Sequence, residues 1–502
     1  MFKKKSNRLP LYFNFNDNTM SDAIRNLSPK PLWNKFADLN AVPRPSKKEQ
    51  GVIKFMKDFG ASLGLQTIED EVGNVIIKKP ATPGMEDRKA IVMQSHLDMV
   101  HQKNSDTVFD FDTQGIQMYV DGDWVRANGT TLGADNGLGV ATIMAVLDSD
   151  TIAHPAIEAL FTIDEETGMT GAIGLKGGLL EGEILLNLDT EEDDEIGVGC
   201  AGGVDVTASG SYHQIPAPKG QGYRITVKGL QGGHSGMDIS KGLGNANKMM
   251  NRLLAANKDI AHIASLAGGS LRNAIPREST AIVVVATQDI SEFVLQMEKL
   301  QFNLVEEYRL LEPDLTIETQ KIDPPQMVMA SKDQTTFINA VYASHNGVYR
   351  MSPAIKGLVE TSNNIAKISV KDATLKIECL TRSSVDSSKD DMAATLTSVF
   401  ELAGYDVDCS GHYPGWAPNM DSAILKVVES LYISLHGEKP NVAACHAGLE
   451  CGILGQNYPK MDMISFGPTI KGAHSPDERA SISSAQKYWK FVLEILKNIP
   501  LK

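Results

Sequence analysis

The first two hundred residues contain short apolar runs separated by polar or helical segments. Four of these runs are rich in β-branched and other apolar residues and predict buried strands: residues 74–79, 89–96, 157–164 and 183–189. Between the second and third runs, residues 136–148 are largely apolar and predict a buried helix. Strands that alternate with helices predict an α/β layer structure around a largely parallel sheet.

Helical patterns precede these runs. Residues 32–64 predict two helices, because Pro43 and Pro45 interrupt the helical pattern between them. Ser46 follows this interruption, and its hydroxyl is expected to cap the second helix. The chain therefore begins its ordered part with a helical pair.

The composition of the sequence changes near residue 200, where residues 199–210 are rich in glycine and small residues and indicate a domain boundary. Strand and helix patterns alternate again through residues 222–400, whose two halves resemble a degenerate repeat. An apolar run at residues 461–467 then resembles the earlier buried strands. We predict an α/β domain interrupted by an inserted α+β domain. The expected parts are an N-terminal extension (1–19), the first domain in two pieces (20–204 and 412–502) and the insert (205–411).

Composition and charge limit the possible partners. A chain of 502 residues is too long for a single core, and 42% hydrophobic with 22% charged residues is typical of a globular protein. The formal net charge of −14 argues against nucleic acid and anionic membrane surfaces, which attract basic patches. No window reaches the roughly 18 apolar residues of a membrane span.

Two further features favour a cytoplasmic protein. The five cysteines are an odd number and none lies in a C-x-x-C pair, a pattern typical of reduced thiols. The N-terminus is basic but lacks the apolar run of a signal peptide. Residues 1–19 are expected to be a flexible extension, with Met20 as the natural start.

Histidines and carboxylates follow the apolar runs and turns. In parallel α/β sheets the carboxyl ends of the strands are where ligands bind, so these side chains are expected to converge on one cleft. The candidates stand directly after a run or in a glycine-rich turn or loop: His96, Asp98, Asp135, Asp164, Glu165, Glu166, Asp189 and His474. Three consecutive acids at 164–166 repel one another unless cations lie beside them.

This set of side chains suits metal ions. Histidine and carboxylate ligands without thiolate favour zinc, manganese or cobalt. Asp135, Glu166 and Asp189 bring three negative charges, so two divalent cations with one hydroxide reach neutrality, whereas one cation leaves the site negative. Each feature alone has a simpler explanation, since Asp135 can cap a helix and residues 187–194 can form a solvated acidic loop. Their joint occurrence favours a dinuclear site.

The order of five motifs resembles that of the aminoacyl-histidine dipeptidases: SHLDMV (95–100), GADNGLG (133–139), DEETGMTGA (164–172), NLDTEE (187–192) and GAHSPDER (472–479). These enzymes, also called Xaa-His or cytosol non-specific dipeptidases, form a branch of the dinuclear-zinc metallopeptidases that includes carnosinase-like dipeptidases and tripeptidases. The resemblance implies a zinc-peptidase catalytic domain with an inserted lid domain. It also implies hydrolysis of unblocked dipeptides, both Xaa-His such as β-alanyl-histidine and broader Xaa-Yaa.

The resemblance further implies roles for the candidate residues. Two divalent ions, zinc first with manganese or cobalt as alternatives, would be held by five ligands: His96 and Asp189 on one ion, Glu166 and His474 on the other, and Asp135 bridging both. Asp98 would not bind a metal ion; its carboxylate would hold the imidazole ring of the ligand His96 in place. Glu165 would be the general base that takes a proton from the attacking water.

The insert also contains family-like polar residues. His234 would stabilise the oxyanion, Arg382 would bind the free carboxylate of the peptide, and Asn273 would contact the substrate. The resemblance implies a homodimer acting on a small peptide, and leaves open whether His234 serves its own chain or a partner. The alternatives are a tripeptidase or N-acyl amino-acid hydrolase of the same clan, and a non-catalytic metal- or peptide-binding relative.

Overall fold

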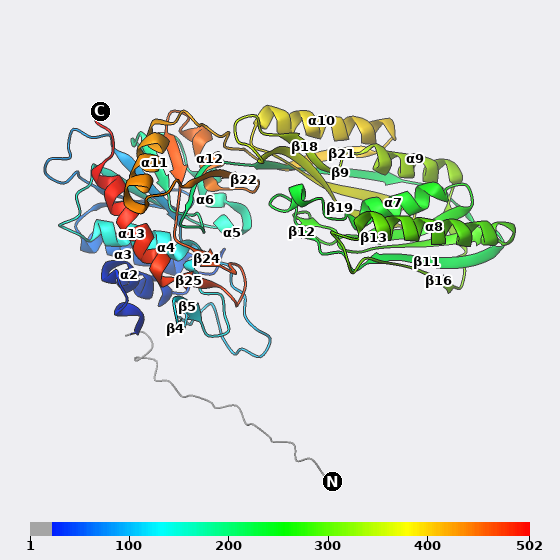
Figure 1. Ribbon diagram of the computed structural model, residues 1–502, viewed down its shortest axis with the longest axis horizontal. Coiled ribbons are helices and arrows are strands. Elements are labelled where there is room, and N and C mark those ends of the chain that lie inside the picture. The colour runs from blue at the N-terminus through cyan, green and yellow to red at the C-terminus, as the bar shows by residue number, and fades with distance from the viewer. Residues whose placement is uncertain (1–22) are drawn as a thin grey trace, which may run out of the picture. The chain divides into compact units, whose positions relative to one another are not determined.

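The computed structural model describes residues 23–502 (Figure 1). The expected extension, residues 1–19, lies outside the described residues. The chain divides into two compact units. The first contains residues up to Gly197 together with Asp421–Val442 and Asn457–Lys502, and the second contains Val198–Met420 and Ala443–Gln456. None of the helices within residues 23–502 has the length and apolar character needed to cross a membrane.

The first unit contains six whole strands, and the beginnings of two others (β8 and β22), of an eight-stranded sheet whose central strands are parallel. In spatial order the strands are β1 (Gln66–Glu69), β2 (Val75–Lys79), β6 (Ile157–Thr162), β3 (Ile91–His96), β7 (Ile184–Asn187), β23 (Asp462–Ser465), β8 (Glu195–Cys200) and β22 (Asn441–Cys445). The parallel pairs join β6, β3, β7 and β23, whereas the pairs β1–β2, β2–β6 and β8–β23 are antiparallel. Every residue of β3, β6 and β7 is buried, as parallel strands covered on both faces require.

Helices and a small sheet complete the first unit. They are α2 (Lys30–Asn40), α3 (Gln50–Ser62), α4 (Ala134–Leu147), α5 (Glu165–Gly168), α6 (Thr170–Gly174), α11 (Ala423–His436) and α13 (Ile482–Lys497), with a four-stranded sheet of β24 (Ile470–Lys471), β25 (Arg479–Ser481), β5 (Trp124–Ala127) and β4 (Met118–Asp121). In α4 every residue except Asp135 is buried, which confirms the predicted apolar helix.

The predicted capping role of Ser46 is wrong. Helix α3 begins at Gln50, its N-cap is Glu49, and no side chain caps it. The Ser46 hydroxyl instead donates to Asp98 Oδ2 at 2.7 Å. A buried carboxylate from a distant strand end therefore takes the hydroxyl that the local sequence pattern assigned to the helix.

The second unit contains two copies of one βαββαβ module. The first copy consists of β11 (Gly220–Lys228), α7 (Ala246–Ala256), β13 (Ala261–Gly268), β15 (Ser279–Ala286), α8 (Ile290–Tyr308) and β16 (Thr316–Ile322). The second consists of β9 (Gly202–Ser211), α9 (Ser331–Ala343), β19 (Val359–Lys371), β20 (Thr374–Ser383), α10 (Asp386–Leu402) and β21 (Asp406–Tyr413). Smaller elements are β10 (Gln214–Pro216), β12 (Gly233–His234), β14 (Ala274–Ile275), β17 (Met327–Met329), β18 (Gly347–Met351) and α12 (Glu450–Asn457).

The two modules share one sheet, ordered β16-β11-β15-β13-β19-β20-β9-β21. Each module arranges its strands in the same order, and the modules join where β13 pairs antiparallel with β19. Helices α7 to α10 pack on this sheet over one continuous apolar core (Figure 1). The unit therefore contains a repeat, although its second copy begins with β9, which precedes the first copy in the chain, and so differs from the two halves of residues 222–400. The α/β class with an inserted α+β domain is confirmed.

Candidate metal centre

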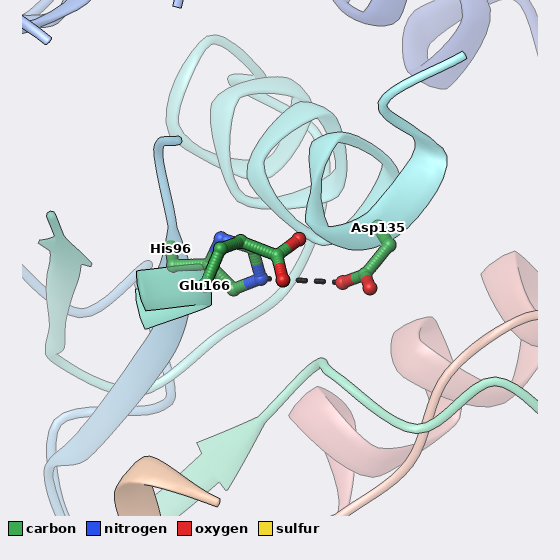
Figure 2. A group of neighbouring side chains, drawn as sticks. All are labelled: His96, Asp135 and Glu166. Carbon is green, nitrogen blue, oxygen red and sulfur yellow. Dashed lines mark hydrogen bonds and ion pairs between the residues drawn. The ribbon is translucent and has the colours of Figure 1, made fainter. Parts of the chain in front are cut away.

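Five side chains from separate elements of the first unit converge at the carboxyl ends of its central strands. His96 ends β3, Asp135 lies at the start of α4, and Glu166 lies in α5. Asp189 follows β7, and His474 lies in the loop between β24 and β25. Figure 2 shows the His96, Asp135 and Glu166 side chains pointing toward one another, and their ligand atoms lie within 4.8 Å of one another. The structure thus brings together the five residues expected to bind metal.

The Asp135 carboxylate faces two different imidazoles. Its Oδ1 lies 3.2 Å from His96 Nε2, and its Oδ2 lies 3.2 Å from His474 Nε2. Asp189 Oδ1 lies 3.6 Å from His96 Nε2, and Glu166 Oε2 lies 3.0 Å from His474 Nε2. The side chains therefore form two groups joined by Asp135, and the grouping is the one that the resemblance implied.

The donor set fits divalent cations. Glu166 Oε1 is buried without a hydrogen-bond partner, which is costly unless a cation or another donor meets it. Hydrogen bonds with Asp135 and Glu166 raise the pKa of His474 to about 11. Burial lowers the pKa of His96, but Asp189, Asp135 and Asp98 together raise it well above its usual value. These carboxylates favour positive charge at both imidazoles, and a divalent cation bound by the same nitrogens would release those protons.

Asp98 links the strand end to the acidic turn. Its Oδ1 lies 3.4 Å from His96 Nδ1 and accepts a hydrogen bond from the Glu165 backbone N–H at 3.0 Å. Its Oδ2 accepts from the Glu166 N–H at 3.3 Å. Asp98 thereby orients the His96 ring and the backbone from which Glu165 and Glu166 project, as a carboxylate behind a ligand does.

The three consecutive acids have different environments. Asp164 has a φ of 53°, is buried, and accepts hydrogen bonds from the hydroxyls of Thr167 and Thr170. Its carboxylate therefore stabilises the turn itself. Glu166 faces His474, while Glu165 is partly exposed. The turn separates the three side chains and so reduces the repulsion that the sequence suggested.

Sequence reasoning missed several residues around this centre. Arg44, Ser46 and Glu478 are buried and bind its backbone or its carboxylates. Burial, together with the charge of Asp135, raises the pKa of the Glu191 carboxyl to about 8. Glu478 and Glu191 left a visible signal, because they stand in the motifs that contain His474 and Asp189.

A second polar cluster lies within the second unit. Arg382 of β20 donates from Nη1 to Tyr413 Oη at 2.7 Å and from Nε to Ser235 Oγ at 3.3 Å. Its Nη2 lies 3.4 Å from His234 Nε2. The Asn273 carbonyl accepts from the Ser235 N–H at 2.8 Å, so Asn273 is next to this cluster through its backbone. The structure therefore brings the three predicted insert residues into one neighbourhood.

Backbone contacts select one tautomer of His234. The N–H groups of Gly236 and Met237 donate to His234 Nδ1 at 3.3 Å and 3.1 Å. Nδ1 is therefore an acceptor, and Nε2 of the neutral ring then carries a proton that Arg382 Nη2, which can only donate, does not accept. His234 can consequently donate a hydrogen bond from Nε2.

His446 is buried in the same unit, with Nε2 2.7 Å from Ser362 Oγ. Burial and the charges of Arg382 and His234 lower its pKa from 6.5 to about 3. At pH values between about 3 and 6.5, His446 binds a proton in the unfolded chain but not in the folded chain. The stability associated with neutral His446 is therefore full above pH 6.5 and is lost as pH falls toward 3.

We expect His446→Gln to reduce this acid sensitivity, because glutamine can keep a hydrogen bond to Ser362 and does not titrate. The free energy of unfolding of the wild type should fall more steeply than that of the variant below pH 6.5, by about 1 kcal/mol per pH unit. Chemical denaturation of both metal-free proteins at pH 7, 6 and 5 measures the difference. Parallel pH profiles would show that His446 does not cause it.

Comparison with known proteins gives consistent matches. Residues 92–498 match the model of peptidase family M20/M25/M40. The chain is 44% identical over 482 residues to the cytosol non-specific dipeptidase of Escherichia coli, covering 95% of this chain and 99% of that protein. The crystal structure of the aminoacylhistidine dipeptidase from Vibrio alginolyticus matches with a TM-score of 0.89 and 45% identity, over 95% of this chain and 98% of that one. The aminopeptidase PepT from Bacillus cereus shares the fold, with a TM-score of 0.55 and 16% identity over 94% of this chain and 99% of that one.

Proposed function

Since the chain belongs to peptidase family M20/M25/M40, we propose that it is a metal-dependent dipeptidase that hydrolyses unblocked dipeptides. Two observations support the substrate class: the dipeptidase of Escherichia coli is similar over nearly the whole chain, and so is the aminoacylhistidine dipeptidase of Vibrio alginolyticus. The observation that carries the proposal is the Asp135 carboxylate, whose two oxygens each face a different histidine at 3.2 Å. This arrangement suits a carboxylate shared by two cations.

We propose that His96, Asp189, Glu166 and His474 hold two divalent cations and that Asp135 bridges them. Zinc is the first candidate, with manganese or cobalt as alternatives, because nitrogen and oxygen donors without thiolate suit all three. Such cations, when bound, polarise a scissile carbonyl and lower the pKa of water to about 7. Asp98 keeps the His96 ring in place through Nδ1.

Glu165 is proposed as the general base. Its backbone is held by Asp98 at 3.0 Å, next to the ligand Glu166, and its side chain is partly exposed. Its carboxylate would take a proton from the attacking water and return it to the leaving amine, a role worth roughly 10²–10⁴-fold in rate. Adjacent residues in a tight turn can divide these tasks because their side chains leave the backbone in different directions.

The polar cluster of the second unit is proposed to bind the substrate. His234 can donate from Nε2 to a developing oxyanion, and the Arg382 guanidinium can bind the free carboxylate of the peptide. Asn273 would contact the substrate beside them. His234 lies in the first module and Arg382 in the second, and both belong to one chain. Their contact therefore needs no partner, so a homodimer stays a prediction that sedimentation of the purified chain would test.

A cytoplasmic location is part of the proposal. The name of the Escherichia coli relative refers to the cytosol, and none of the five cysteines, all of which lie within residues 23–502, forms a disulfide bond. Reduced thiols are typical of that compartment.

Chelation and substrate length test the proposal together. We expect dialysis against a chelator to abolish hydrolysis of Ala-Ala and β-alanyl-histidine, and zinc, manganese or cobalt to restore it, because the five ligands hold ions that activate water. Release of amino acids measures the rate. Assays with Ala-Ala-Ala and N-acetyl-Ala serve as controls for a tripeptidase and an N-acyl hydrolase.

Three results would contradict parts of this proposal. Faster cleavage of Ala-Ala-Ala or N-acetyl-Ala would overturn the dipeptidase assignment. Full activity after exhaustive chelation would remove the metal mechanism. Binding of dipeptides by the metal-loaded protein without turnover would identify a non-catalytic relative.

A further inference from the structure

A buried carboxylate binds the turn that presents Asp135. Glu478 is 2% exposed, and its carboxylate accepts hydrogen bonds from four consecutive backbone amides, Leu132–Asp135. The distances from Leu132, Gly133 and Ala134 are 2.7, 2.9 and 2.7 Å, and that from Asp135 is 3.2 Å. Two of these amides precede α4 and two belong to its first turn, where backbone N–H groups have no partners within the helix and carry partial positive charge.

A buried arginine binds the same turn from its carbonyl side. Arg44 is 1% exposed and donates from Nη2 to the Gly133 carbonyl at 2.5 Å. Its Nη1 donates to the carbonyls of Leu97 and Asp98, each at 3.1 Å. Arg44 thus connects the Asp135 turn to the segment that directly follows His96. One guanidinium therefore connects the backbone next to His96 with the backbone next to Asp135, two of the three proposed ligands of one ion.

The backbone at Gly133 leaves little freedom for another arrangement. Gly133 has a φ of 69°, a conformation that favours glycine, and a Cβ there would lie 2.5 Å from Arg44 Nη2. Its N–H is bound by Glu478 and its carbonyl by Arg44. One peptide is therefore held from both sides by buried charged groups.

We propose that Glu478 and Arg44 are positioning residues that fix the Leu132–Asp135 turn so that Asp135 offers one oxygen to each of two cations. The inference rests on the proposed dinuclear site. A bridging carboxylate must present both oxygens at once, and rotation of its backbone would move one of them away from its cation. Groups that orient ligands in this way typically contribute 10–100-fold to metal affinity.

Glu478→Gln tests the proposal. The carboxylate accepts hydrogen bonds from these backbone N–H groups with both oxygens, whereas the NH₂ group of glutamine is a donor and cannot accept them. Glu312→Gln is the matched control. Glu312 is 1% exposed in the second unit and accepts from the Gln231 and Gly244 N–H groups at 2.7 and 2.8 Å. Both variants should melt at lower temperature as metal-free proteins. Only Glu478→Gln should weaken binding of Co²⁺, by about 10–100-fold, measured by equilibrium dialysis and by the visible spectrum of bound cobalt.

The proposal would be overturned if Glu478→Gln bound Co²⁺ with the affinity and spectrum of the wild type, since Glu478 would then have a purely structural role. It would also be overturned if Glu312→Gln weakened cobalt binding as much as Glu478→Gln does. If Glu478→Gln does not fold, Arg44→Lys examines the same turn. Lysine keeps the charge but loses the forked geometry that reaches the Leu97, Asp98 and Gly133 carbonyls together, so it should also weaken cobalt binding about 10-fold or more. Unchanged affinity in that variant would likewise overturn the proposal.

Failure of the proposed function gives a different result. A wild-type protein that binds no Co²⁺ would refute the dinuclear site and this inference with it. The positioning role alone would be refuted if the wild type bound two ions and hydrolysed dipeptides while Glu478→Gln bound Co²⁺ with the same affinity as the wild type.

Discussion

Replacing Glu165 with glutamine is expected to lower kcat for dipeptide hydrolysis by roughly 10²–10⁴-fold while both cations stay bound. Glutamine has nearly the same size as glutamate but cannot accept the proton of the attacking water. The Glu165 backbone N–H, which donates to Asp98 at 3.0 Å, is not altered by the substitution. Initial rates at saturating metal, combined with elemental analysis of bound metal per chain, measure both halves of the prediction.

Glu192→Gln is a suitable control for this experiment. Glu192 belongs to the acidic segment after β7, and its carboxylate pairs with Lys471 rather than with the ligands. Its replacement removes one negative charge near the centre without removing the proposed base, so kcat should change little. A fully active Glu165→Gln enzyme would show that another group moves the proton.

Replacing Asp135 with alanine is expected to have the larger effect, because one side chain then disappears from both groups of ligands. His96 and His474 each lose the carboxylate oxygen that lies 3.2 Å away. We expect loss of bound metal and a fall in kcat/KM of more than about 10⁴-fold, which exceeds the contribution of the base alone. Metal titration followed calorimetrically and dipeptide assays test the two effects separately.

Asp148→Ala controls for the loss of an aspartate from α4. Asp148 caps the opposite end of this helix, and its carboxylate pairs with Lys35 Nζ at 2.7 Å. That variant should bind metal and hydrolyse dipeptides as the wild type does. Retention of two tightly bound ions by Asp135→Ala would falsify the bridging role.

Local patterns in the sequence determined five buried strands of the first unit. The apolar runs predicted β2, β3, β6, β7 and β23 to within two residues at each end. A strand covered on both faces needs a continuous apolar run, and that requirement is visible without any tertiary information. The candidate ligands were identified for the same reason, because each follows such a run or lies in a glycine-rich turn or loop.

The pairing of the sheets shows a partial success. The sequence indicated parallel strands, and the four central strands are parallel, but the pairs β1–β2, β2–β6 and β8–β23 are antiparallel. Apolar periodicity reports burial and not strand direction, which depends on the route that the chain takes between strands. The repeated module of the second unit became clear only from its strand order for the same reason.

The partners of buried polar groups were decided by the tertiary structure alone. Ser46 matched a helix cap in sequence, yet its hydroxyl binds Asp98, 52 residues away. Glu478 binds the Ala134 amide across 344 residues. Burial repeats within an element and leaves a pattern along the chain, so the sequence determined the five buried strands and indicated the candidate side chains at their ends. Which distant loop supplies the partner of a buried charge depends on the topology that brings the loops together, and no local pattern records it.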